Sequence, residues 1–280
     1  MIGVVGLGVV GGATAKLFER ANCPVLTYDI RGVGNCSSIR EIAEKASVTF
    51  VCVPTPQGLM NRLDTHIVSE VCEQLAEYAD GSHVTAVRST VPIGTCKALK
   101  GCVVYNPEFC NARTAYEDML AADRVVLGGP SGGVERVVSA YEEVAARTGK
   151  QWAYVRTTWE NAEALKLVTN SAMAVKITFA NEAAILCNKL GANWDEVSRL
   201  LALDPRLGSV GFQVPGPDGK LGFGGACLPK DLSGLIAQAN MVSTPIGVAE
   251  AAHRQNVHIR KCVAAWRELV ENLFAAEGKP

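Results

Sequence analysis

A glycine motif at the start of the chain constrains the fold more than any other feature. Gly6, Gly8 and Gly11 form a G-x-G-x-x-G pattern that follows the apolar run "IGVV" and opens a helical pattern. In this context the first glycine allows a tight turn, the second lets the backbone approach a pyrophosphate, and the third lets helix and strand pack closely. Free N–H groups at the helix start favour the phosphates of a dinucleotide. These residues alone leave open a glycine turn without a ligand.

The first half of the chain alternates β-rich runs with helical patterns. Several of the runs are continuously apolar, as expected for strands that are buried on both faces. We expect strands at residues 2–5, 24–29, 48–54, 83–89, 102–107, 124–129 and 152–156. Strand–helix–strand alternation predicts an α/β fold with a doubly wound parallel sheet, an N-terminal Rossmann domain over residues 1–156.

A second, all-helical domain is expected over residues 157–280, because the texture changes near residue 156. Residues 160–190 contain no proline or glycine, and Gly191 ends the pattern. Apolar residues recur there at steps of three and four, which predicts one long amphipathic helix. This apolar stripe consists of Leu165, Val168, Ala172, Val175, Phe179, Ala183 and Leu186. The stripe is longer than a small domain can cover, so we expect a homodimer.

Composition excludes several classes of partner. The formal net charge is -1 and no dense Lys/Arg block occurs, so we expect no nucleic-acid partner. No apolar run is long enough for a bilayer, so we expect no membrane association. The chain has 10 cysteines but no C-x-x-C pair, which argues against a metal site. Most of these thiols are expected to be small buried side chains of a cytoplasmic protein.

Polar residues follow several of the expected strands. Asp29 ends the second one, where a carboxylate can accept hydrogen bonds from the adenosine ribose and repel a 2′-phosphate. This favours NAD as the cofactor, although Arg31 leaves NADP open. Thr55 and Thr90 follow the third and fourth strands, at the edge where open α/β sheets bind ligands. For each threonine, a turn or a helix cap is an equal alternative.

Two pairs of residues at helical spacing suggest chemistry. Lys166 and Asn170 share a face of the long helix, where an ammonium can stabilise a developing alkoxide; a solvated lysine is the alternative. Cys227 precedes a Leu-Pro pair that opens a helix, and Lys230 adds positive charge, so both favour a thiolate. Asp231 lies one turn further on and can move a proton or hold a water. A structural cysteine in a glycine loop remains possible.

The combination resembles a known family. The stretches "GLGVVGG", "VPTP", "RSTVPIGT", "NPEF", "EALKLVTNSAMAVKITFANE", "DPRLG" and "GFGGACLPKD" occur in the order seen in the nucleotide-sugar 6-dehydrogenases, the UDP-glucose dehydrogenase family. The resemblance implies four-electron oxidation of a UDP-sugar C6 alcohol with two NAD per turnover, UDP-glucose to UDP-glucuronate being the expected case. It also implies a Cys227 thiohemiacetal and thioester, with hydrolysis promoted by Glu108 and a water positioned by Thr90.

The same resemblance assigns roles to individual residues. The implied catalytic residues are Cys227, Lys166, Asn170, Asp231, Glu108 and Thr90. The implied cofactor-binding residues are Gly6, Gly8, Val9, Val10, Gly11, Asp29, Pro54, Thr55, Ser89, Thr90 and Lys230. The implied substrate-binding residues are Glu108, Phe109, Cys110, Lys166, Asn170, Phe223, Gly224 and Arg206, the last of which would reach across a dimer.

One difference from the family and two alternative functions accompany the resemblance. Family members typically carry a C-terminal UDP-binding domain, which we expect this chain to lack. A two-electron β-hydroxyacid dehydrogenase is the main alternative, because that family shares a nucleotide domain and a Lys-x-x-x-Asn helix but uses no cysteine. A non-catalytic binding or regulatory paralogue is the second alternative.

Overall fold

The computed structural model describes residues 1–261, and the chain divides into two compact units. The first unit comprises residues 1–59 and 63–167, and the second comprises residues 60–62 and the chain from 168 onward. The first unit therefore includes the opening turns of the long helix, beyond the boundary expected near residue 156. The helical sequence expected after Lys261 lies outside the described residues.

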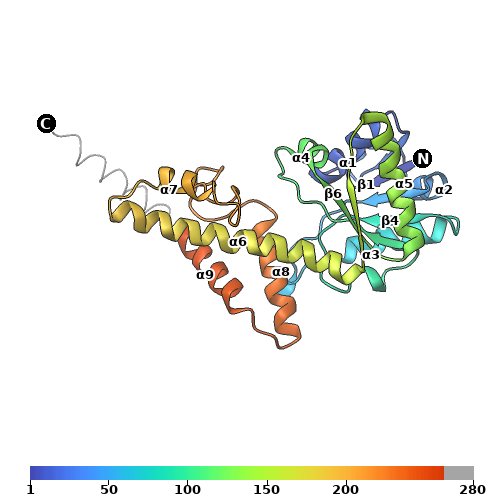
Figure 1. The fold of residues 1–280 in the computed structure, drawn as a ribbon. Coiled ribbons are helices and arrows are strands. Elements are labelled where there is room, and N and C mark those ends of the chain that lie inside the picture. Colours follow the sequence, from blue (N-terminus) through green and yellow to red (C-terminus); the bar gives the residue numbers. More distant parts are fainter. Residues whose placement is uncertain (262–280) are drawn as a thin grey trace. The chain divides into compact units, whose positions relative to one another are not determined.

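The first unit is built on a seven-stranded sheet in the order β2-β1-β3-β4-β5-β6-β7 (Figure 1). Neighbouring strands are parallel except β5 and β6, which join through one antiparallel pair, Tyr105 and Gly128. The strands are β1 (Ile2–Val5), β2 (Val25–Tyr28), β3 (Val48–Val51), β4 (Val84–Val87), β5 (Val103–Tyr105), β6 (Arg124–Gly128) and β7 (Ala153–Thr157). The predicted doubly wound α/β domain is thus confirmed.

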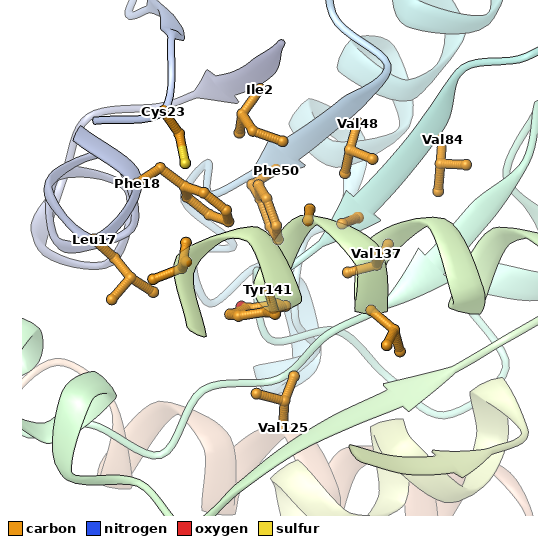
Figure 2. Packing of buried hydrophobic residues seen from close by; sticks show 14 of the residues in the cluster. Ile2, Leu17, Phe18, Cys23, Val48, Phe50, Val84, Val125, Val137 and Tyr141 are labelled. Atoms are coloured by element: carbon orange, nitrogen blue, oxygen red, sulfur yellow. The ribbon is translucent and has the colours of Figure 1, made fainter. Parts of the chain in front are cut away.

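Helices cover both faces of this sheet. One face packs against α1 (Val9–Arg20) and α5 (Ser131–Thr148), and the other against α2 (Ile39–Lys45) and α3 (His66–Tyr78). The remaining helical segments are η1 (Leu59–Asn61), η2 (Cys96–Ala98) and α4 (Ala115–Ala121). Figure 2 shows the first face, where Phe18 and Phe50 lie beside Tyr141 of α5. The Phe18 and Phe50 ring centroids lie 5.2 Å apart, and those of Phe50 and Tyr141 lie 6.0 Å apart.

The second unit is helical, as predicted. It contains most of α6 (Trp159–Lys189), then α7 (Trp194–Leu201), α8 (Leu228–Met241) and α9 (Gly247–Lys261). One small core forms around Trp194 and Phe212, and another around Phe223 and Leu232. Within residues 1–261, no helix combines the length and the apolar character that crossing a bilayer requires.

The predicted apolar stripe on α6 faces outward. In the second unit Val168, Phe179 and Leu186 are 52%, 64% and 58% exposed. The side chains that α6 buries there are smaller, such as Ala174 and Ala180. The helix therefore covers its own core with small residues and leaves larger apolar side chains in contact with solvent.

Candidate functional site

The glycine loop has the geometry that a dinucleotide needs. Gly6 adopts a φ of +87°, which L-residues rarely adopt. A Cβ at Gly11 would lie 1.7 Å from the Gly6 carbonyl oxygen, so only glycine lets α1 approach β1 this closely. Gly8, the N-cap of α1, has no atom within 4 Å of the equivalent position, which leaves open space beside the first amides of the helix. Val9 and Val10 supply those first helical residues. The loop therefore fits a pyrophosphate at the start of α1.

Asp29 follows β2 and holds a fixed carboxylate. It accepts the Leu7 amide at 2.6 Å, and the Arg31 Nε donates to it at 2.8 Å. The hydrogen bonds from the Arg31 side chain lower the pKa of Asp29; they outweigh burial, which raises it, and the Leu7 amide adds to the lowering. The Asp29 side chain is 7% exposed and that of Arg31 is 62% exposed. The Asp29 carboxylate is thus ionised and held in a fixed orientation at the end of β2.

Two further expected cofactor segments lie side by side. Pro54 and Thr55 follow β3, and Ser89 and Thr90 follow the adjacent strand β4, at the carboxyl edge of the sheet. The Ser89 hydroxyl donates to the Val53 carbonyl at 2.6 Å, so the two segments are tied together. Thr55 and Ser89 are buried, whereas Thr90 is half-buried.

Glu108 and Lys166 form a buried ion pair in the first unit. The Lys166 Nζ lies 3.0 Å from Glu108 Oε1, and the side chains are only 4% and 9% exposed. Nζ also donates to the Glu108 carbonyl, while the Cys110 amide donates to Glu108 Oε2 at 2.7 Å. Burial raises the pKa of Glu108, but the Lys166 ammonium, the Cys110 amide and Arg88 outweigh it and hold the pKa below its usual value. Lys166 is therefore no solvated surface charge.

The second unit holds the other expected catalytic group. Cys227 is exposed and is the N-cap of α8, with Pro229 in the first turn, as predicted. Asp231 is fully buried one turn later, and its amide donates to the Cys227 carbonyl at 2.8 Å. Asn170 Nδ2 donates to Asp231 Oδ2 at 2.5 Å, and Lys230 Nζ lies 2.7 Å from Asp231 Oδ1. Both carboxylate oxygens are thus held by side-chain donors.

Comparisons with known proteins show the family to which the chain belongs. Residues 33–145 match the model of the UDP-glucose/GDP-mannose dehydrogenase family, NAD binding domain. Residues 160–258 match the central domain of the same family. The chain belongs to the UDP-glucose/GDP-mannose dehydrogenase family. NAD is therefore the cofactor of the first unit, in agreement with the glycine loop and Asp29.

Individual relatives agree with this family. The chain is similar to a UDP-glucose 6-dehydrogenase of Rhizobium meliloti (strain 1021), with 34% identity over 239 residues, which are 79% of this chain and 53% of the relative. It is also similar to a solved UDP-glucose dehydrogenase from Pyrobaculum islandicum, with a TM-score of 0.79 and 26% identity over 92% of this chain and 68% of that chain. The chain spans about half the length of the curated relatives it matches.

A third neighbour shows how widely the fold is shared. A Mycobacterium tuberculosis 3-hydroxyisobutyrate dehydrogenase structure has a TM-score of 0.70, with 17% identity over 90% of this chain and 91% of that chain. At this identity the likeness concerns the fold alone.

Several residues that were expected to bind the substrate make contacts within the protein instead of standing open. Phe223 is 2% exposed and packs in a core with Leu232, so its side chain serves packing. At Gly224 a Cβ would lie 2.3 Å from the Arg260 guanidinium, so a larger residue there would displace this side chain of α9. Phe109 is 40% exposed and lies with its ring centroid 5.4 Å from the Lys166 Nζ. The Arg206 side chain is 86% exposed and pairs with Asp204.

Two buried charges were missed by the sequence analysis. Glu163 has no exposed surface, and its carboxylate accepts the amides of Gly94 and Cys96 at 2.5 and 2.7 Å. Arg88 is 4% exposed and donates to Asn106 at 2.8 Å. A signal existed for each, because Arg88 interrupts an apolar strand pattern and Glu163 precedes Lys166 by one helical turn.

Proposed function

We propose that this chain carries out NAD-dependent, four-electron oxidation of the C6 alcohol of a UDP-sugar, UDP-glucose to UDP-glucuronate being the expected case. One observation carries the proposal: an exposed thiol, Cys227, at the start of α8, one turn from the buried Asp231 carboxylate. A helix N-terminus favours a thiolate, and an alcohol oxidation that stops at the aldehyde needs no such nucleophile. The family match and the similarity to UDP-glucose 6-dehydrogenases support it.

The first oxidation converts the alcohol to an aldehyde. When bound, NAD supplies the hydride acceptor in this chemistry. Lys166 stabilises the negative charge that develops on the sugar oxygen, because its ammonium is buried and fixed by Glu108. Asp231 accepts the hydroxyl proton through a water, and Asn170 and Lys230 fix the orientation of its carboxylate.

The second oxidation passes through the sulfur of Cys227. The thiolate adds to the aldehyde carbon to give a thiohemiacetal, and loss of a second hydride from that carbon gives a thioester. Water then attacks the acyl carbon, the carbon–sulfur bond breaks, and the products are the carboxylate and the Cys227 thiol. Glu108 accepts a proton from this water, which Thr90 positions. The sum consumes one water and releases two reduced cofactors per sugar.

The test is to count NADH per sugar consumed, with purified protein and a panel of UDP-sugars. The proposal predicts two NADH per sugar and an acid product. Cys227→Ser should lower turnover to acid on the order of 10³-fold or more, because an ordinary hydroxyl is a poor nucleophile. Cys187→Ser, the same change in the same unit, is the control and should retain turnover. Acid formation at the normal rate by Cys227→Ser would overturn the proposal.

A two-electron β-hydroxyacid dehydrogenase is the second candidate. Lys166 and Asn170, four residues apart on α6, favour it, because the sequence analysis found the same Lys-x-x-x-Asn pair in that family. The same assay separates the two candidates. This second reaction yields one NADH per substrate, is supported by β-hydroxyacids rather than by UDP-sugars, and is indifferent to Cys227→Ser.

We further propose that the outward face of α6 forms a homodimer. Val168, Phe179 and Leu186 expose more than half of their surface on one helix, and apolar patches of this kind mark association surfaces. Arg206, whose side chain is 86% exposed, would then contact the substrate of the second copy. Sedimentation velocity tests this proposal, with Phe179→Glu expected to give monomers. Val248→Glu, at an exposed apolar position of α9, should leave the dimer intact. A monomeric native protein would refute the dimer.

A further inference from the structure

Arg88 is a buried cation with an unusual set of partners. Its Nη1 donates to Asn106 Oδ1 at 2.8 Å and to the Tyr141 hydroxyl, and its Nη2 lies 3.9 Å from the Met119 sulfur. None of the carboxylates in residues 1–261 forms an ion pair with it, and its Nε has no hydrogen-bond partner among those residues. A buried charge without a carboxylate partner is costly, so its retention calls for a specific use.

The partners of Arg88 hold the start of the "NPEF" segment. Asn106 is 1% exposed, and its Oδ1 accepts from both Arg88 and the Tyr141 hydroxyl, the latter at 2.8 Å. Its Nδ2 donates to the Val126 carbonyl at 2.9 Å. The amide side chain is therefore fixed at both ends, two residues before Glu108. Figure 2 shows the Tyr141 ring beneath α5, packed between Phe50 and Val125.

The backbone of Arg88 leads directly into the second expected hydrolytic residue. Its amide donates to the Val51 carbonyl at 2.9 Å, which continues the sheet by one residue beyond β4. Ser89 is tied to Val53, and Thr90 follows. Arg88 thus connects two segments. Its side chain holds the loop that carries Glu108, and its backbone leads into the segment that carries Thr90.

We infer that Arg88, supported by Tyr141, is the positioning residue for the thioester-hydrolysis step, in which it holds Glu108 and Thr90 in register around the attacking water. This inference rests on the proposed function. The step itself is balanced: Glu108 takes a proton from water, the oxygen bonds to the acyl carbon, and the sulfur of Cys227 leaves and is reprotonated.

The charge of Arg88 acts on Glu108 as well. Arg88, Asn106 and Glu108 line one cavity of about 80 Å³, together with Asp118 of α4 and Cys110. Lys166 faces Glu108 from α6. Among these groups, the Lys166 ammonium and Arg88 lower the pKa of Glu108, against the effect of burial. Loss of the Arg88 charge therefore raises that pKa, and a step that needs ionised Glu108 loses rate at a higher pH than in the native protein.

The experiment compares Arg88→Met, Arg88→Lys and Tyr141→Phe with Trp152→Phe as the control. Trp152 packs on the same Tyr141 ring, at 5.7 Å between centroids, but no hydrogen bond joins it to Asn106. Steady-state kinetics with UDP-glucose and NAD give kcat, KM and the pH profile. Rapid quenching followed by intact mass measurement gives the fraction of Cys227 that is acylated.

We expect Arg88→Met to lower kcat by about 10- to 100-fold with KM nearly unchanged. Acylated Cys227 should accumulate, because both hydride transfers still occur, and the acidic limb of the kcat profile should move to higher pH. Arg88→Lys should keep the native limb, since the charge remains, with a smaller loss of kcat. Tyr141→Phe should also keep the limb and accumulate acyl-enzyme, and Trp152→Phe should show neither effect.

The outcomes separate the inference from the proposed function. If the native protein makes acid and these variants keep its kcat and its pH limb, the inference is wrong and the proposed function stands. If Trp152→Phe and Tyr141→Phe behave alike, the role is one of packing and the inference is again wrong. If Arg88→Met does not fold, Arg88→Lys and Tyr141→Phe still decide. A native protein that oxidises no UDP-sugar overturns both.

Discussion

Two glycine-rich loops, one in each unit, open a helix in different ways. Residues 6–11 form the turn before α1 and its first residues, and residues 222–227 lead into α8. In the first loop, a Cβ at Gly11 would meet the Gly6 carbonyl at 1.7 Å, and one at Gly6 would meet the Cys52 carbonyl at 2.8 Å. The neighbours that require glycine are therefore backbone atoms just beyond the ends of β1 and β3, which cannot rotate aside as a side chain can.

The second loop is held by side chains. A Cβ at Gly222 would lie 2.4 Å from Asn256 Oδ1, and one at Gly224 would meet Arg260. Asn256 also accepts the Phe223 amide at 2.8 Å and donates to its carbonyl at 3.0 Å. This loop thus depends on α9, more than thirty residues further along the chain. The cofactor loop is therefore specified by the backbone around it, whereas the cysteine loop is specified by a few polar side chains that can be changed one at a time.

The strongest way to break the first loop is Gly11→Ala. The added Cβ cannot be relieved by a side-chain rotation, so we expect the first unit to lose about 3 kcal/mol or more of unfolding free energy and to stop binding NAD. Gly12→Ala is the matched control, because nothing lies within 4 Å of its Cβ position and alanine favours a helix. It should leave the melting temperature equal or higher. Thermal unfolding and calorimetric NAD titration provide both readings, and equal stability of the two variants would contradict the close approach.

A substitution that disrupts the second loop should lower turnover without changing the affinity for NAD. Asn256→Ala removes the partner of the Phe223 amide, a buried donor, which costs about 1–3 kcal/mol. We expect turnover to fall while the affinity for NAD stays native, because the first unit is untouched. Arg254→Ala, on the same helix but with a 71% exposed side chain, is the control and should be neutral. A parallel loss of NAD affinity in Asn256→Ala would show that the two loops are less independent than their contacts indicate.

The elements that depend on a local sequence pattern were predictable. All seven expected strands are present, and the helix expected over residues 160–190 spans Trp159–Lys189. These elements were predictable because buried strands are short apolar runs and a long helix repeats its period many times. The N-terminal position of Cys227 on α8 followed equally from the Leu-Pro pair beside it.

The rest depends on partners that are distant in sequence. Glu163 accepts an amide from Gly94, 69 residues earlier, and Arg88 meets Tyr141, 53 residues later. A single sequence shows that these residues are charged but not that the fold buries them. The same holds for Phe223, which was expected at a sugar and packs in a core. Spacing within one element is predictable, whereas a hydrogen bond between elements requires the topology.

The smallest expected effect concerns Arg31, whose side chain donates to Asp29 and to the Leu7 carbonyl of the cofactor loop. Arg31 donates to both oxygens of Asp29, yet it is exposed, so Arg31→Ala should leave the melting temperature at pH 7 and NAD affinity nearly native. NADP should remain excluded, because the Asp29 carboxylate persists.

The same substitution should change acid unfolding. The pKa of Asp29 is lowered in the folded state, so its contribution to stability exists above the unfolded pKa of about 3.9 and is lost as pH falls. Removing Arg31 raises that pKa, and acid unfolding should therefore begin at a slightly higher pH. Arg124→Ala, which removes an exposed pair with Asp123, is the control. If Arg31→Ala instead admitted NADP or abolished NAD binding, cofactor selectivity would depend on Arg31 and not on Asp29 alone.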